Sequence, residues 1–434
     1  MDNSRSQKSL GDYVELQRGN TYKSALLGQP GPVLLGLASI ARNGGFRSDN
    51  LKTYGGDSDV RMLLEPGDIY VSLKDVTQSA DLLGAVSRVP STISQGRLTQ
   101  DTVKLNFKDG NAPKDYIYWL LRTPQYRAYC RAHATGTTNL GLPRDDFLSF
   151  PVPDITPNRK ELVSLLQAFD DKIELNHQTN ETLEAMARAI FKDWFVDFGP
   201  TRAKAEGREL YLSAELWDLF PDVLDDEDKP VGWTTRQASD LFEFNPRETI
   251  RKGADAPYLD MAALPTTGLV PDAPSRREYK SGSKFRDGDT LFARITPCLE
   301  NGKTAYVFGL GDGVVGAGST EFIVIRSKEP VPAPVSYLLA RDPEFRRHAE
   351  RSMTGTSGRQ RANAEALMRY ELASPSDDAA WRALGDLTEP MIARVIANAH
   401  EARTLAQTRD LLLPKLMSGE IRLRDAEKAV EAVA

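Results

Sequence analysis

The sequence feature that most constrains the fold is a long helical pattern over residues 156–199. Its apolar positions recur in alternating steps of four and three residues, the a/d spacing of a coiled coil, and this narrow stripe requires a partner helix. Thr156 is suited to the N-cap, Pro157 to the first helical position and Gly199-Pro200 to the end. The stripe consists of Leu162, Leu166, Phe169, Ile173, Leu183, Ala187, Ile190 and Trp194, with Asn176 and Asn180 in the two remaining positions.

The chain also contains an internal repeat. Residues 122–127 (RTPQYR) match residues 341–346 (RDPEFR), and the TGT of 135–137 matches that of 354–356, both at an offset of 219 residues. Because order and spacing agree, we infer one module used twice. Each module combines short strand-like runs with a helical patch, which predicts an α+β fold.

The repeat predicts a second long helix over residues 377–420. Its apolar stripe is weaker than the first, and Pro390 and Pro414 lie inside it, so we expect a kink or break at both. The equivalent stripe positions are Leu384, Thr388, Met391, Val395, Asn398, Ala402, Leu405, Arg409, Leu412 and Leu416.

Two tandem α+β domains separated by a pair of long antiparallel helices, related by a pseudo-twofold axis, are the simplest arrangement. An antiparallel pair could bring Asn176 and Asn398 together and fix the helix register; asparagines tolerated at a wet stripe are the alternative. The predicted segments are a first domain (1–155), the first long helix (156–199), an aromatic and acidic connector (200–232), a second domain (233–376), the second long helix (377–420) and a C-terminal tail (421–434).

Composition limits the function classes. The formal charge is -6, but residues 218–229 alone hold six acids and one lysine, so the remainder is near neutral and basic faces are possible. Two cysteines and four scattered histidines provide neither a disulfide framework nor zinc-ligand spacing. No run approaches the roughly eighteen apolar residues of a membrane helix, so we expect a cytoplasmic protein without a membrane partner.

Catalytic motifs are incomplete. Residues 297–304 approach a phosphate-binding loop, but Pro297 replaces its first glycine and a strand-like run follows. Gly311, Gly313 and Gly316 also lead into a strand, and no catalytic triad stands out. We therefore expect a protein that is not an enzyme and that binds no cofactor or metal.

Basic and polar residues near glycine turns are candidates for DNA binding, because arginine and glutamine suit base edges while lysine and hydroxyl groups suit phosphates. For any single residue, a solvated surface position is the alternative. The candidates in the first module are Arg42, Asn43, Arg47, Lys74, Thr135, Thr137, Thr138, Asn139 and Arg144. Those in the second are Arg276, Arg277, Lys280, Arg294, Thr354, Thr356, Arg359, Gln360 and Arg361, with Lys284 and Arg286 in the same basic span.

Several separate motifs resemble the specificity subunits of Type I restriction-modification systems. The stretch 170–198, from DDKIELN through NETLEAMA to WFVDF, is similar to the conserved central helix of that family. Further similar runs are DLFP at 218–221 before Gly232-Trp233, ARITPC at 293–298, and LLLPKL at 411–416 leading into SGEI at 418–421.

This resemblance implies two target-recognition domains, each recognising one half of a bipartite asymmetric site in double-stranded DNA, with the helix pair setting the spacer. It also implies two methyltransferase subunits that bring S-adenosylmethionine, and restriction subunits that use ATP and magnesium. A coiled-coil adaptor that never contacts DNA is the alternative: it explains the helices but not the duplicated basic turns.

Overall fold

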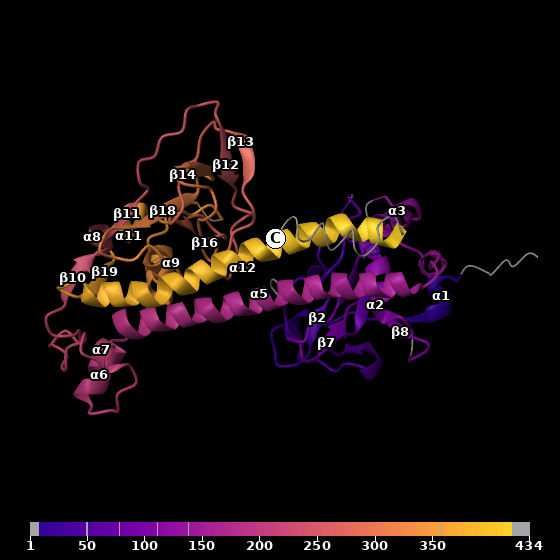
Figure 1. Ribbon diagram of the computed structural model, residues 1–434, viewed down its shortest axis with the longest axis horizontal. Helices are drawn as coiled ribbons and strands as arrows, with labels where there is room; N and C mark the ends of the chain where they lie inside the picture. Colours follow the sequence, from indigo (N-terminus) through magenta and orange to yellow (C-terminus); the bar gives the residue numbers. More distant parts are fainter. Residues whose placement is uncertain are drawn as a thin grey trace, which may run out of the picture. The chain divides into compact units, whose positions relative to one another are not determined.

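The computed structural model describes residues 8–48, 51–77, 79–110, 112–137, 139–356 and 358–418, with side chains as far as residue 414. Its contacts divide it into two compact units, Met1–Lys172 with Thr404–Ala434, and Ile173–Arg403. Each unit contains one globular module and parts of two long helices (Figure 1). Strands and helices mix within both modules, which confirms the predicted α+β class.

The first module is built on a four-stranded antiparallel sheet in the order β1-β8-β4-β6. Its strands are β1 (Val14–Arg18), β4 (Ile69–Ser72), β6 (Val86–Arg88) and β8 (Thr102–Phe107); a smaller sheet contains β2 (Val33–Leu35), β7 (Gly96–Leu98) and β3 (Leu63–Leu64), and β5 (Lys74–Asp75) pairs with β9 (Leu140–Gly141). The helices are α1 (Leu10–Tyr13), α2 (Lys114–Leu120), α3 (Pro124–Ala132) and α4 (Arg144–Leu148), with single 3-10 turns η1 (Ser24–Leu26), η2 (Leu37–Ser39) and η3 (Val60–Met62).

The central strand β4 is buried on both faces, which explains its run of three large hydrophobic residues, Ile69, Tyr70 and Val71. Ile69 and Val71 pack into a core with Trp119 of α2 and Tyr126 of α3. Tyr70, which points to the opposite face, packs into a second core beneath the smaller sheet. Because successive side chains of β4 point to opposite faces of the sheet, this strand contributes to both hydrophobic cores of the module.

The second module repeats this topology with a four-stranded sheet in the order β11-β18-β15-β16. Its strands are β11 (Phe242–Phe244), β15 (Thr290–Ala293), β16 (Thr304–Tyr306) and β18 (Phe322–Ser327); the smaller sheet contains β13 (Ser275–Glu278), β12 (Asp255–Leu259), β17 (Gly316–Gly318) and β14 (Ser283–Phe285), and β10 (Thr234–Gln237) pairs with β19 (Glu371–Ser374). The helices are α8 (Ala238–Leu241), α9 (Val335–Arg341), α10 (Pro343–Arg351) and α11 (Ala364–Met368).

The two modules correspond element by element, as the internal repeat predicts. Strands β1, β8, β4 and β6 occupy the places of β11, β18, β15 and β16, and in both smaller sheets a parallel pair, β2 with β7 or β12 with β17, lies next to an antiparallel strand. The main difference is β13, an additional edge strand in the second module.

The predicted long helices are α5 (Pro157–Phe195) and α12 (Ala379–Ser418). In the second unit they run antiparallel, because Asn176 contacts Asn398 while the rings of Phe195 and Trp381 stack with centroids 4.1 Å apart. In the first unit, Leu166 of α5 and Leu412 of α12 share a core. Most of the predicted stripe positions with described side chains are buried or partly buried, so the a/d spacing located the contact face.

Two expectations about the helices need correction. Helix α12 is continuous through Pro390 and Pro414, so neither proline breaks it, and the alternative of a kink stays a prediction. Helix α5 ends at Phe195, and Gly199 begins the short helix α6 (Gly199–Ala205) instead of ending α5. A side chain at Gly199 would collide with the Asp193 carboxylate, so this glycine serves close packing.

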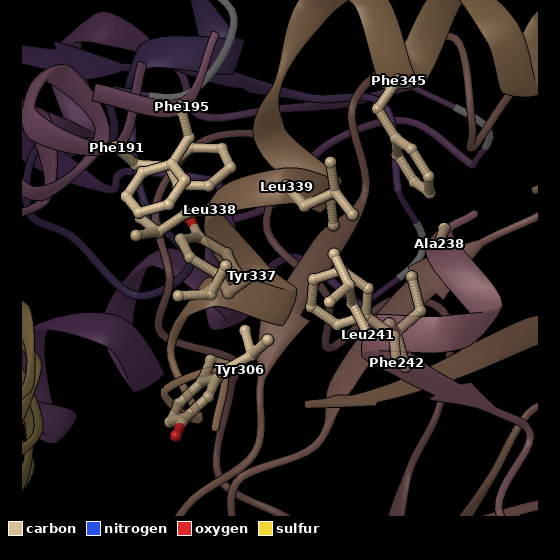
Figure 2. Packing of buried hydrophobic residues seen from close by; sticks show 14 of the residues in the cluster. Phe191, Phe195, Ala238, Leu241, Phe242, Tyr306, Tyr337, Leu338, Leu339 and Phe345 are labelled. Carbon is tan, nitrogen blue, oxygen red and sulfur yellow. The ribbon is translucent and has the colours of Figure 1, made fainter. Parts of the chain in front are cut away.

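The connector packs against the end of α5 in the second unit. It contains α6 and α7 (Ala214–Trp217), and the ring of Phe220 lies edge-on to Trp194 with centroids 5.1 Å apart. Close by, the rings of Phe191 and Phe195 stack beside Leu338 of α9 (Figure 2). Aromatic residues of the connector, α5 and the second module therefore belong to one core.

Candidate nucleic-acid interface

Three predicted residues of the first module line one cavity of about 400 Å³. Lys74 lies on β5, Thr135 pairs with Gly141 in an antiparallel bridge, and Arg144 is the first residue of α4. We call this cavity the first-module pocket; it is lined by Leu16, Arg18, Leu73, Lys74, Gln100, Asp101, Val103, Thr135, Gly141, Leu142, Pro143 and Arg144. Arg18, Gln100 and Asp101 were not identified from the sequence. These residues lie at strand ends that only sheet pairing brings together, so no local sequence pattern indicates that they share a site.

Polar groups fix the geometry of the pocket. Lys74 forms an ion pair with Asp101 at 3.1 Å, and the Thr135 hydroxyl donates to the Gly141 carbonyl at 3.0 Å. The Arg18 Nε donates to the Gln100 carbonyl at 3.1 Å. Within the described residues, neither Arg18 nor Arg144 forms an ion pair with a carboxylate, so the rim keeps two uncompensated cations.

Two buried charged side chains form hydrogen bonds with the backbone of the loop that follows β5. The Asp75 carboxylate, completely buried, accepts from the amides of Thr77 and Leu82, both at 2.7 Å. Arg127 of α3, also buried, donates to the carbonyls of Ala80 at 2.9 Å and Asp81 at 2.8 Å. The sequence gives no sign of this role for Asp75 and Arg127, because their partners are backbone groups that only the folded chain brings close.

The remaining first-module candidates lie outside the pocket. Arg42 is 81% exposed and lies 3.9 Å from Asp81, while Asn43 adopts a left-handed conformation and donates its amide to the Asp81 carbonyl at 3.0 Å. Arg47 lies on the same exposed loop. Thr137 and Asn139 are exposed on the turn that begins at Thr135, and Thr138 lies outside the described residues.

In the second module, the structure brings Arg294, Thr354, Gln360 and Arg361 together. Thr354 pairs with Arg361 across a turn, and Arg361 also bridges to Ile295. The Gln360 carbonyl accepts from the Thr296 amide at 3.0 Å, and the Arg294 Nε is buried without a hydrogen-bond partner among the described residues. Thr356 and Arg359 are exposed on the turn itself.

Arg361 is already engaged by a carboxylate. Its Nε and Nη2 donate to both oxygens of Glu321 at 2.7–3.0 Å. The Arg361 hydrogen bonds lower the pKa of the Glu321 carboxyl below its ordinary value. This pair fixes the orientation of the guanidinium, and the sequence could not reveal it because the two residues are 40 positions apart.

The basic span 276–286 is more neutral than its sequence suggests. Arg276 of β13 pairs with Asp255 of β12 at 2.6 Å, and Arg277 pairs with Asp260 at 3.2 Å. Lys280 is exposed. The carboxylate partners at 248, 255 and 260 come from outside the span. Arg286 lies 3.5 Å from Glu248, and Lys284 donates to the Glu248 carbonyl at 2.8 Å.

The asparagines of the helix pair form a polar layer in the second unit. Asn176, 2% exposed, donates to the Asn398 carbonyl at 3.4 Å and to the Glu401 carboxylate at 2.7 Å. Asn398 donates to the Asn180 side chain at 2.9 Å. The contact therefore involves four polar residues, and the predicted role of Asn176 and Asn398 in setting register stays a prediction.

The arginine of the repeated motif is connected to α5 in both modules, directly in the first and through Tyr337 in the second. Arg122 donates to Asp170 at 2.8 Å in the first unit. In the second, Arg341 donates to the Tyr337 hydroxyl at 2.9 Å, which donates in turn to Glu184 of α5 at 2.7 Å. The sequence identifies these arginines as repeated but gives no sign of their partners.

The described residues contain no cluster of three or more potential metal ligands, and none of their helices is long and apolar enough to span a bilayer.

Comparison with known proteins finds specificity subunits of Type I restriction enzymes among the similar sequences. The chain is 23% identical to the HindI specificity subunit of Haemophilus influenzae over 63% of its own length and 69% of that protein. It is 22% identical to the MjaIX specificity subunit of Methanocaldococcus jannaschii over 79% and 75% of the two chains. This chain is a homologue of Type I restriction enzyme specificity subunits.

The fold agrees with that assignment. The crystal structure of a specificity (S) subunit from M. genitalium superimposes with a TM-score of 0.52 at 14% identity, covering 96% of this chain and 98% of the other. No family model matches the sequence. The homology to Type I specificity subunits expected from the motifs, and the fold with two modules and a helix pair, are thus both confirmed.

Proposed function

We propose that this chain is the DNA sequence-specificity subunit of a Type I restriction-modification complex and is itself not catalytic. Each module recognises one half of a bipartite asymmetric site in double-stranded DNA, while α5 and α12 set the length of the spacer. Two methyltransferase subunits bring S-adenosylmethionine, and restriction subunits bring ATP and magnesium.

The observation that carries this proposal is the structural duplication in a homologue of specificity subunits. Both modules have the same strand order, and both present an exposed turn, at 135–141 and 354–361, next to the end of a central strand. Two similar modules on one helix pair suit two separated half-sites. A coiled-coil adaptor would need the helices but not the duplicated turns.

The test is co-expression of the chain with a methyltransferase subunit that assembles with it, followed by mapping of methylated adenines across a host genome. We expect methylation at one bipartite motif, and its loss when Arg359 and Arg361 are both changed to alanine. The matched control changes Arg347 and Arg351, which are exposed on α10 of the same module. Absence of methylation from an assembled, cofactor-loaded complex would favour the adaptor.

A further inference from the structure

We propose that the first-module pocket binds one phosphodiester group of the DNA backbone together with its deoxyribose, and that the second module has no equivalent site. This proposal rests on the proposed function, and it assigns Arg18 and Arg144 to positioning the duplex instead of selecting bases. Phosphate contacts fix register and orientation but carry no direct sequence information.

The charge of the pocket suits an anion. Three cationic side chains, those of Arg18, Lys74 and Arg144, reach it from three separate elements. The single lining carboxylate, Asp101, is 3.1 Å from Lys74 and balances that charge. The surplus therefore belongs to Arg18 and Arg144, both of which are exposed at the rim.

The floor of the pocket suits an apolar ring attached to that anion. Leu16, Val103 and Leu142 are each at most 9% exposed and belong to the module core, so the floor is rigid. The volume of about 400 Å³ lies in the range of small-ligand sites. A sugar-phosphate unit combines an apolar carbon face with a charge that stays near the rim, which matches this distribution.

In the second module, a side chain fills the place that corresponds to the first-module pocket. Gly141 pairs with Thr135 as Arg361 pairs with Thr354, so the two residues are structurally equivalent. Asp101 precedes β8 as Glu321 precedes β18. In the second module the Arg361 side chain binds Glu321, whereas glycine at 141 contributes no side chain and leaves the pocket open.

This equivalence provides a variant that closes the pocket. A Cβ at Gly141 would lie 3.6 Å from the Thr135 hydroxyl, an ordinary contact, so a side chain fits there. Gly141→Arg therefore introduces the side chain that the second module carries at the same place. It should block the pocket by occupancy, whereas Arg18→Gln and Arg144→Gln should weaken it by removing charge.

The experiment measures duplex binding by the specificity subunit assembled with its methyltransferase partners, at several salt concentrations. We expect Arg18→Gln, Arg144→Gln and Gly141→Arg each to weaken binding roughly tenfold, by the same factor for cognate and unrelated duplexes. Arg18→Gln and Arg144→Gln should each also reduce the magnitude of the slope of log affinity against log salt by about 0.9. Arg131→Gln, an exposed change on α3 outside the pocket, is the control.

A second measurement locates the phosphate. Neutral methylphosphonate groups, placed one at a time along each half-site, should weaken wild-type binding at one position where Arg18→Gln causes no further loss. The proposal would be overturned if the control Arg131→Gln changed duplex affinity as much as the three pocket variants do. It would also be overturned if a pocket variant relaxed the methylation motif at one base pair. Neither result would contradict the specificity role. If the wild-type complex neither binds nor methylates a bipartite site, the proposed function itself fails.

Discussion

Arg361 illustrates at the level of a single residue why a basic side chain on a turn is not automatically available to DNA. Both Glu321 oxygens accept from its guanidinium, and the Arg361 side chain is 45% exposed. Under the proposed function, Arg361 would exchange this partner for a base edge or a phosphate. The proposed binding would then include the cost of separating a bidentate pair.

Glu321→Gln should lower the stability of the chain modestly. The pair is partly exposed, so we expect a loss of about 0.5–1 kcal/mol at pH 7, measured by thermal unfolding of the purified chain. Because hydrogen bonding to Arg361 lowers the pKa of Glu321 from its ordinary value of 4.5, the ionised pair stabilises the fold above that pH. The difference between wild type and variant should therefore persist from pH 7 to about 5 and shrink below pH 4.5.

The control for this prediction is Glu365→Gln on α11, an exposed carboxylate of the same module. It should change stability by less than about 0.5 kcal/mol at any pH tested. A stability difference for Glu321→Gln that grows as the pH falls would contradict the sign derived from the lowered pKa.

At the scale of elements, the sequence predicted what depends on local periodicity. The a/d spacing placed α5 and α12, and the repeated motifs predicted two modules of the same topology. The expected break at each proline is absent because a helix that packs along its length tolerates one missing amide donor per proline. The charge balance of the basic span was not predictable for another reason: strand pairing brings Asp255 to Arg276, and pairing across a sheet is not encoded in local composition.

The contacts between the modules and α5 were also beyond local prediction. Arg341, 7% exposed, donates to the carbonyls of Thr266, Gly302 and Thr304 at 2.7–3.0 Å. These acceptors are backbone groups of two loops and of strand β16, which leave no side-chain signature. The first-module pocket has the same character, since its cations come from β1, β5 and α4.

Asp170 provides a prediction at this scale, because it connects three elements of the first unit. Its carboxylate accepts from Arg122, which follows α2, at 2.8 Å, and from Arg409 of α12. Asp170→Asn leaves the largely buried Arg122 guanidinium without a carboxylate partner, whereas Arg409 keeps Asp410 at 2.8 Å. We expect a loss of about 1–3 kcal/mol in the free energy of unfolding. Chemical denaturation followed through the buried Trp119 of the same unit measures it.

The neighbouring Asp171→Asn is the matched control, since Asp171 is exposed and accepts from Gln167 one turn earlier at 2.8 Å. It should change stability by less than about 0.5 kcal/mol. Equal effects of the two substitutions would show that Asp170 has no special role in holding α5 to the first module and α12.

For the whole molecule, the formal charge of -6 limits how the proposed DNA binding could work. A chain with this balance gains little from long-range attraction to DNA, so the proposed binding would depend on local cationic faces. Several cations are already neutralised by ion pairs, Arg276 and Arg277 among them. We therefore expect the methyltransferase partners to supply part of the phosphate contacts, and the assembled complex to bind duplex DNA more tightly than the chain alone.

The spacer role makes a geometric prediction about the two long helices together. Four residues inserted in α5 after Lys172 and four in α12 before Thr404 lengthen each helix by roughly 6 Å and rotate its continuation by about 40°. One added base pair rotates the second half-site by about 34–36° and moves it by about 3.4 Å. The rotation caused by the inserted residues thus corresponds to about one added base pair, while the translation corresponds to one to two base pairs.

We therefore expect the double insertion to lengthen the methylated motif by one to two base pairs while both half-sites keep their sequence, as measured by mapping methylated adenines. Insertion in α5 alone shifts the apolar stripe of α5 against that of α12 and should abolish methylation, because the contacts of Asn176 with Asn398 and of Asp170 with Arg409 can then no longer both form. Altered half-sites with an unchanged gap would mean that the modules, and not the helices, determine the spacing. A gap that follows the inserted length would assign the spacing to α5 and α12, since neither module has been touched.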